Sequence, residues 1–164
     1  MNPTRGGWVI LLTIVFGMIL SVARLPDFVP SWAGWLRPQW VVLVLFFWVI
    51  EFPDRVGMIL AWCLGFLLDA LNAEPLGING LCLATITFIA WSFHERLRMY
   101  SIVQQATVLF VLVIGVQYLR ASVHSLTLDT PVSLALAVPA VTSTILWPFV
   151  AGALRGVSQR FRVR

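Results

Sequence analysis

Apolar residues fill six stretches of this chain, and short polar or proline-containing segments separate them. Within each stretch the apolar residues are almost continuous, and a helix that is apolar on all sides is either buried or in a membrane. Several stretches are shorter than the ~20 residues that a perpendicular membrane-spanning helix needs, but flanking tryptophan and arginine can extend them. The pattern predicts six membrane-spanning helices, at about residues 8–23, 38–52, 56–71, 78–93, 102–119 and 131–154.

The composition supports a membrane location for these helices. Apolar residues make up 60% of the 164 residues and charged residues only 11%, whereas a soluble domain carries about 25% charged residues. A chain of this length with so few charges cannot cover an aqueous surface. The sequence therefore predicts an all-α integral membrane protein in which residues 1–164 form a single bundle of six transmembrane helices.

The basic residues divide unequally between the two predicted sides of the membrane. All eleven are arginine; eight lie on the side of the N-terminus and three on the other side. Because cytoplasmic loops carry an excess of positive charge, we expect both termini in the cytoplasm. The larger set is Arg5, Arg55, Arg96, Arg98, Arg155, Arg160, Arg162 and Arg164, and the smaller set is Arg24, Arg37 and Arg120.

The first apolar stretch has a second interpretation. Arg5, the apolar run after it and the small residues 21–23 resemble a signal peptide with its cleavage site. A retained first helix is the simpler interpretation, because the run is longer than most signal-peptide cores and five more apolar stretches follow.

One acid lies inside the third apolar stretch. Asp69 is about 20 Å along the helix from Val56 at 1.5 Å per residue, which places it in the outer part of the membrane. A carboxylate at the membrane centre costs about 2.5–3.5 kcal/mol, so Asp69 is expected to face the bundle interior. Asn72 lies one turn further on and can donate to it, and Asn79 is placed to cap the next helix. We expect Asp69, Asn72 and Asn79 to form an intramembrane polar cluster, which either joins two helices or is contacted from outside by a partner or ligand.

Small residues precede the aspartate at intervals of four. Gly57, Ala61 and Gly65 form this stripe, and small residues at such spacing allow another helix to approach closely in a membrane. The sequence predicts a helix-packing surface here.

A second group of polar residues ends the fifth apolar stretch on the outer side. Gln117, Tyr118, Arg120 and His124 could line an outer crevice, although solvated residues at a helix end are the simpler interpretation.

No motif for catalysis, metal binding or cofactor binding is present. The sequence has no phosphate-binding glycine-rich loop, no nucleophile elbow and no His/Cys cluster, so neither an enzyme nor a cofactor is expected. The net charge is +4, but the arginines flank apolar stretches and form no concentrated patch, so nucleic acid is not an expected partner.

The order of several short motifs resembles a known family. Arg37-Pro38-Gln39-Trp40, the run from Gly65 to Leu71, Pro75-Leu76-Gly77-Ile78-Asn79-Gly80, Arg96-Leu97-Arg98-Met99-Tyr100 before Gln104-Gln105, and Trp147-Pro148 are similar in order and spacing to MreD, the rod shape-determining family of bacterial inner-membrane proteins. The resemblance covers nearly the whole chain.

This resemblance implies a fold and a role that the residues alone do not give. The implied fold is similar to the substrate-binding membrane subunits of energy-coupling-factor transporters. The implied role is a non-catalytic scaffold of the cell-elongation complex, which directs lateral peptidoglycan synthesis. The implied partners are MreC, RodA, a transpeptidase and MreB filaments, all at the bilayer of the inner membrane.

A different class of function stays open at this point. A solute-binding membrane subunit of a vitamin-type transporter would also have short spans and a polar cluster at a helix break. Its copurification with an ATPase module would distinguish it from a scaffold, which should bring MreC.

Overall fold

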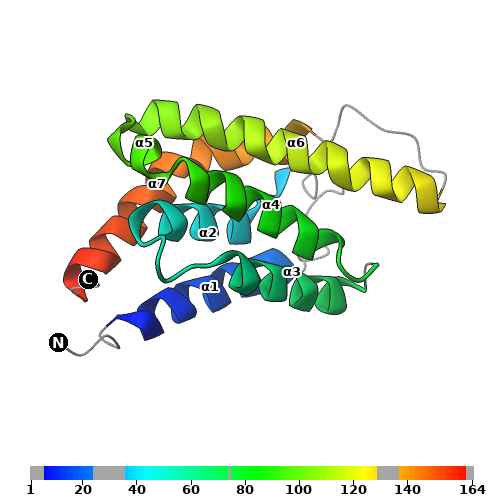
Figure 1. The fold of residues 1–164 in the computed structure, drawn as a ribbon, viewed down its shortest axis with the longest axis horizontal. Coiled ribbons are helices and arrows are strands. Elements are labelled where there is room, and N and C mark those ends of the chain that lie inside the picture. The colour runs from blue at the N-terminus through cyan, green and yellow to red at the C-terminus, as the bar shows by residue number, and fades with distance from the viewer. Residues whose placement is uncertain (1–5, 24–35, 74, 129–136, 162–164) are drawn as a thin grey trace, which may run out of the picture.

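The computed structural model describes residues 6–23, 36–73, 75–128 and 137–161, without the side chains of 123–128. This part of the chain contains seven α-helices and no strand (Figure 1). The helices are α1 (Gly7–Val22), α2 (Trp40–Glu51), α3 (Met58–Asn72), α4 (Ile78–Ser92), α5 (His94–Met99), α6 (Ile102–Leu128) and α7 (Val138–Arg160). The predicted all-helical class is confirmed.

The helices follow the predicted apolar stretches closely in the first half of the chain and less closely in the second. α1 to α4 begin and end within about two residues of the predicted bounds, within the usual uncertainty of helix ends. α6 continues to Leu128, beyond the predicted end at 119, and α7 continues to Arg160, beyond 154. The predicted start of the last stretch, 131–136, lies outside the described residues. An apolar run marks where a helix can contact lipid, so polar residues that prolong the same helix are missed.

A short helix was not predicted at all. α5 carries Glu95 in its first turn and Arg96 and Arg98 in its last turn, and only Leu97 is buried. These charges interact favourably with the helix dipole, because acidic residues stabilise the first turn of a helix and basic residues stabilise the last. A six-residue charged helix leaves no apolar periodicity to detect.

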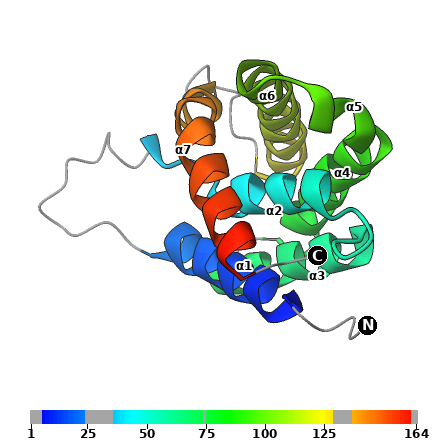
Figure 2. The same ribbon diagram turned by 90° about the vertical axis from the view of Figure 1, so that its left-hand side faces the viewer.

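α2 is the central helix of the bundle. Every residue from Val41 to Ile50 is buried, so this helix is apolar on all its faces and covered on all of them. Figure 2 shows α2 surrounded by α1, α3, α4, α6 and α7. At twelve residues it is only about 18 Å long.

Two neighbours are fixed to α2 by specific contacts. On the α1 side, Trp48 Nε1 donates to Thr13 Oγ1 at 2.9 Å. On the α7 side, the Phe46 and Trp147 rings meet edge to face with centroids 5.1 Å apart. Aromatic pairs in this geometry contribute about 0.5–1.5 kcal/mol beyond their buried area.

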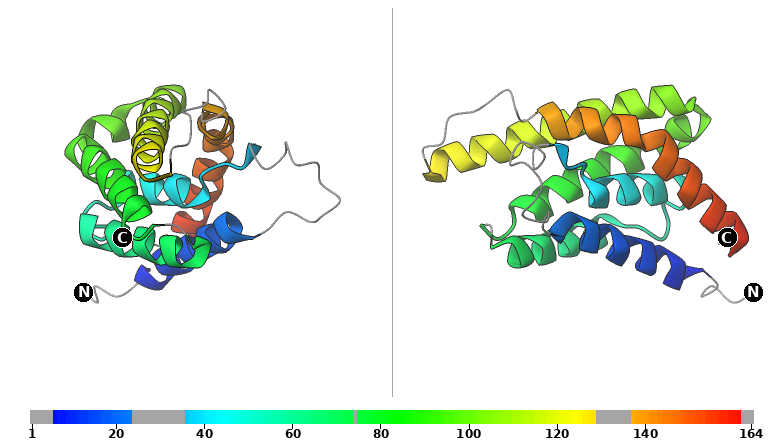
Figure 3. Two further views of the ribbon diagram at one scale, coloured as in Figure 1. Left: turned by 90° about the vertical axis from the view of Figure 1, so that its right-hand side faces the viewer. Right: turned by 180° about the vertical axis from the view of Figure 1, so that it is seen from behind.

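The first and last described helices meet at one end of the bundle. The rings of Trp8 in α1 and Phe161 after α7 are 5.3 Å apart in an edge-to-face contact. Figure 1 and the right-hand view of Figure 3 show α1 beginning and α7 ending at the same end, where α5 also lies. The helices between them run alternately toward and away from this end, and the far end of α6 extends beyond its neighbours.

The outer surface of the bundle is strongly apolar. Large apolar side chains are exposed on α1, α3, α6 and α7, with Ile59 at 78% and Phe149 at 76% of full exposure. Apolar surface of this extent requires a cover, and in a membrane protein that cover is lipid or a partner. Within the described residues, two helices are long and apolar enough to cross a bilayer, Ile102–Ser122 and Val138–Arg160, and four shorter helices are also apolar.

Candidate functional site

Asp69 is the centre of a polar lock between α3 and α4. It is fully buried, and its carboxylate accepts three hydrogen bonds from the start of α4. Oδ2 accepts the backbone N–H of Gly77 at 2.7 Å, and Oδ1 accepts both the backbone N–H of Asn79 at 3.1 Å and its Nδ2 group at 2.7 Å. Hydrogen bonds to a carboxylate are stronger than neutral ones, so these bonds offset much of the cost of burying the acid.

The aspartate acts as the N-terminal cap of a helix to which it does not belong. The first N–H groups of any α-helix have no partner within the helix. The N-cap residue of α4 is Gly77, which has no side chain to supply an acceptor and adopts φ of +101°, a conformation that favours glycine. Asp69 supplies the missing acceptor from α3. The prediction that Asn79 is the N-cap was wrong, because Asn79 is the second residue of α4.

Asn72 does not have the role that its spacing predicted. It is exposed and donates none of the three hydrogen bonds described for the carboxylate. The physical reason is that the oxygens of Asp69 turn toward the start of α4, which offers backbone and side-chain donors together. Asn72 instead lines a cavity beside the lock, and Asn79 lines the same cavity.

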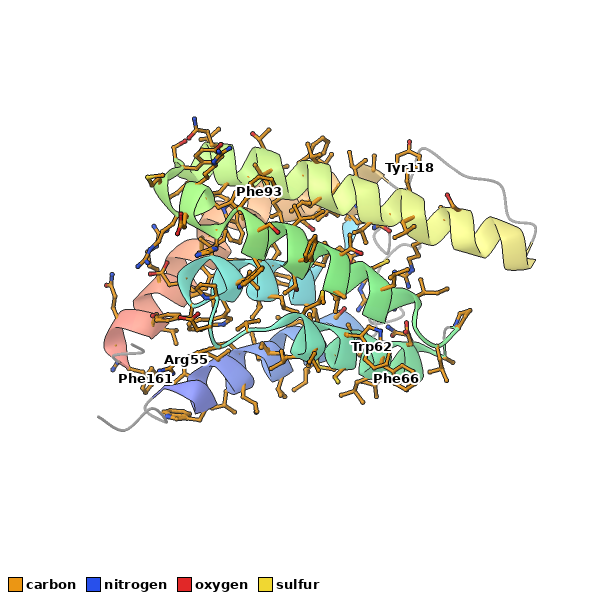
Figure 4. The ribbon with its side chains drawn as sticks, in the orientation of Figure 1. Arg55, Trp62, Phe66, Phe93, Tyr118 and Phe161 are labelled. Atoms are coloured by element: carbon orange, nitrogen blue, oxygen red, sulfur yellow. The ribbon has the colours of Figure 1, made fainter. Side chains whose placement is uncertain are left out.

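Gly65 provides the close approach that brings the two helices together. A Cβ atom added at this glycine would overlap the backbone of Gly80 in α4. Gly80 in turn packs on Trp62, since a Cβ built there would lie 3.2 Å from the Trp62 carbonyl oxygen. The side chains of Trp62 and Phe66 lie side by side on α3 (Figure 4), with ring centroids 5.8 Å apart.

The predicted stripe of small residues is therefore divided. Ala61 and Gly65 are buried within the chain. Gly57 lies outside the helix as the N-cap of α3, and a Cβ there would meet nothing within 4 Å. The stripe cannot serve as a surface for another protein at Gly65, because α4 already occupies the close approach.

A cavity of about 460 Å³ opens beside the lock, at the end of the bundle opposite Trp8 and Phe161. Residues of α1, α3, α4 and α6, together with the start of α2 and the segment that leads into it, form its walls. Apolar side chains such as Leu83 and Val113 form part of the lining. Its polar lining residues are Ser21, Arg37, Gln39, Asn72, Asn79, Gln117 and Arg120.

The four residues expected at an outer crevice have different positions. Gln117 is buried, and both Gln117 and Arg120 line the cavity. Tyr118 is 47% exposed and points away from the helices in Figure 4. The side chain of His124 lies outside the described residues.

Sequence reasoning missed part of the cavity lining. Arg37 and Gln39 precede α2, and Ser21 lies in the last turn of α1. Arg37 was considered as a marker of membrane orientation and as part of a family motif but not as a site residue, and nothing in the local sequence joins it to Arg120. Only the tertiary arrangement places these two arginines around one space.

The side chains at this site can donate hydrogen bonds, and the two arginines can bind an anion. The cavity presents guanidinium and amide groups, which donate hydrogen bonds to oxygen-rich groups. In the described part of the chain, no three His, Cys, Asp or Glu side chains come together where they could hold a metal ion.

These features define a class, a small helical membrane protein with a partly polar cavity at one end of the bundle. A family model described as rod shape-determining protein MreD matches residues 4–157, and the chain belongs to this family. The rod shape-determining protein MreD of Haemophilus influenzae is 30% identical over 132 residues, which are 78% of this chain and 79% of that protein. The resemblance recognised in the sequence is confirmed, and with it a role in determining rod shape.

No solved structure matches this chain. The similarity to the substrate-binding subunits of energy-coupling-factor transporters therefore stays a prediction.

Proposed function

We propose that this protein is a non-catalytic scaffold of the bacterial cell-elongation complex, which regulates lateral peptidoglycan synthesis through helix–helix contacts with MreC. RodA, a transpeptidase and MreB filaments are the further proposed partners. Membership of the rod shape-determining family supports this proposal most directly. The geometry is compatible with it, because the described polar residues offer binding groups and the outer surface offers apolar side chains.

We propose further that α1, α2, α3, α4, α6 and α7 cross the inner membrane and that both termini lie in the cytoplasm. The contact between Trp8 and Phe161 supports a common side for the two ends. The arginines support the choice of side, because five of the seven described ones lie toward this end and positive charge accumulates in the cytoplasm. The five are Arg55, Arg96, Arg98, Arg155 and Arg160, and the other two are Arg37 and Arg120.

The short central helix is compatible with such a topology. A bilayer core is about 30 Å thick, whereas α2 is about 18 Å long. Because every residue from Val41 to Ile50 is covered by neighbouring helices, α2 has little lipid-facing surface to match to the bilayer.

The surface that meets MreC must be sought away from the α3–α4 contact. Gly65 is occupied by Gly80, so the partner has to pack on exposed apolar side chains. Phe16 on α1, Val111 on α6 and Phe149 on α7 are each more than 60% exposed, and they sample three different helices.

Site-specific photocrosslinking in cells tests the scaffold role. A photoreactive phenylalanine analogue at Phe16, Val111 or Phe149 should crosslink to MreC from at least one face, and the same analogue at Phe46, which is fully buried, should give none. Crosslinks to an ATPase module in place of MreC would contradict the scaffold and favour a transporter subunit.

Reporter fusions test the topology. Joined after residue 164, a reporter that works only in the cytoplasm should be active, and a reporter that works only outside the cytoplasm should be inactive. A reporter inserted after Ser122, in the part of α6 that extends beyond the bundle, should be active only if it functions outside. The opposite result at either position would reverse the proposed orientation.

A further inference from the structure

We propose that the cavity beside the Asp69 lock binds a phosphate ester, with Arg37 and Arg120 as the charged groups that recognise it. The amides of Asn72, Asn79 and Gln117 provide the neutral polar groups of the same site. This inference does not depend on the scaffold role, because it rests only on the composition and position of the cavity.

The charge of the lining points to an anion. Two arginines and no acid are found among the described residues that line the cavity. Asp69 lies next to it, but its oxygens are engaged by Gly77 and Asn79. Arginine is the residue best suited to phosphate, since its planar guanidinium donates two parallel hydrogen bonds to neighbouring oxygens.

The positions of these polar groups in the fold support a ligand site in the cavity. Arg37 and Arg120 come from different segments, yet both line one cavity at an end of the bundle. Gln117 is a buried amide that follows the apolar residues 108–116 of α6, and it lines the same cavity as Arg120. Empty cavities in proteins are typically apolar, whereas polar side chains form part of this lining.

The size and the apolar part of the lining narrow the ligand class. A volume of about 460 Å³ exceeds what inorganic phosphate needs and falls in the range of small-molecule sites. Leu68, Leu83 and Val113 form part of the lining together with the polar groups. This combination fits a phosphate that carries an organic group, either the headgroup of an anionic lipid or a soluble phosphate ester.

The lock gives Asp69 a positioning role in this site. By accepting the Nδ2 group of Asn79, its carboxylate fixes the orientation of an amide that lines the cavity. It also fixes the start of α4, from which Asn79 and Cys82 both face the same space.

Native mass spectrometry of the purified full-length protein tests the proposal with three probes: phosphatidylglycerol, zwitterionic phosphatidylcholine and glycerol 1-phosphate. The variant is Arg37→Gln/Arg120→Gln. Its matched control is Arg155→Gln/Arg160→Gln, which removes the same charge from exposed positions at the opposite end. The unsubstituted protein should bind phosphatidylglycerol in preference to phosphatidylcholine. Its affinity for phosphatidylglycerol should fall about tenfold or more in the cavity variant and not in the control, as expected when charge-assisted hydrogen bonds are removed.

The outcomes separate the two sources of phosphate. Arginine-dependent binding of phosphatidylglycerol assigns the site to lipid, and arginine-dependent binding of glycerol 1-phosphate alone assigns it to a soluble ester. No binding of either probe, or an equal loss in both double variants, overturns the proposal. Arg37→Lys/Arg120→Lys should recover part of the affinity, because it restores the charge without the planar fork.

Thiol protection provides a second measurement that leaves both arginines intact. Cys82 is buried and lines the cavity, whereas Cys63 is exposed and is not among the lining residues. In a Cys63→Ala background, phosphatidylglycerol or glycerol 1-phosphate should slow alkylation of Cys82 by a neutral maleimide. In the matched Cys82→Ala background, neither should change the rate at Cys63. Equal rates at Cys82 with and without both probes would overturn the proposal.

Discussion

The pairs α3–α4 and α6–α7 both pack in contact, but they use glycine in different ways. In α3–α4, Gly65 meets the backbone of Gly80, and Asp69 ties the two helices together by three hydrogen bonds. In α6–α7, a Cβ at Gly115, Gly152 or Gly156 would meet nothing within 4 Å. Side chains such as Leu109 and Trp147 fill the core there instead.

This difference shows that the sequence spacing of glycines does not by itself identify the glycines at which membrane helices pack closely. Gly152 and Gly156 have the four-residue spacing associated with close helix packing, yet no described atom of this chain approaches them. Gly65 and Gly80 are on different helices and form no motif in sequence, yet among the described glycines a Cβ added at Gly65 would meet the nearest atoms, those of the Gly80 backbone. Substitutions should therefore affect the two regions very differently.

The largest effect is expected from Gly65→Ala. The new Cβ would overlap the backbone of Gly80, and a backbone can move only if the whole of α4 moves. Overpacking typically costs about 1–3 kcal/mol, and this site belongs at or above the upper value because no flexible side chain can yield. Membrane abundance and the melting temperature in detergent should both fall, and cells should lose their rod shape.

Gly115→Ala is the matched control for that change. It adds the same methyl group to a membrane helix but has open space around it. A melting temperature for Gly65→Ala equal to that of Gly115→Ala would show that α3 and α4 are not in close contact.

The next effect is expected at Asp69, where two substitutions separate packing from charge. Asp69→Leu leaves the N–H groups of Gly77 and Asn79 without their acceptor, at about 1–3 kcal/mol for each buried group. Asp69→Asn keeps one oxygen, so it can preserve the bonds from Asn79 while its amide group faces the Gly77 N–H. The asparagine variant should be intermediate in melting temperature and the leucine variant should be worst.

Cell shape measured beside protein level decides whether the charge itself is used. Intermediate abundance with partial rod shape for Asp69→Asn would agree with a positioning role. Normal abundance with complete loss of shape would show that a partner or ligand contacts the charge directly.

The sequence predicted the helical membrane class, the approximate bounds of α1 to α4 and the inward orientation of Asp69. Each of these depends on local properties: apolar length, and the cost of a carboxylate in lipid. The partner of Asp69 was only half identified, because i and i+3 spacing favoured Asn72 while the folded chain offers the whole start of α4. Arg37 and Arg120 are 83 positions apart in the chain, so only the tertiary fold could place them at one cavity.

A smaller effect is expected from Gly77→Ala. This residue has φ of +101°, and no atom lies within 4 Å of an added Cβ, so the cost is backbone strain alone. The left-handed region costs an L-residue about 1–2 kcal/mol. The melting temperature should fall less than in Gly65→Ala. Gly57→Ala should leave it unchanged, because Gly57 has φ of −87° and equally open space. Equal melting temperatures for the two variants would contradict the strained turn.

The smallest effect, and one of opposite sign, is expected from Gly152→Ala and Gly156→Ala. Both residues lie inside α7, where glycine is about 0.5–1 kcal/mol less favourable than alanine, and neither has a neighbour that a methyl group would disturb. Each substitution should therefore leave the melting temperature in detergent unchanged or raise it slightly, in contrast to Gly65→Ala. A fall in melting temperature of the isolated protein would mean that these glycines pack within the chain, and the contrast between the two helix pairs would then be lost. Because detergent removes any partner, an unchanged melting temperature combined with loss of rod shape in cells would assign this face of α7 to contact with another protein.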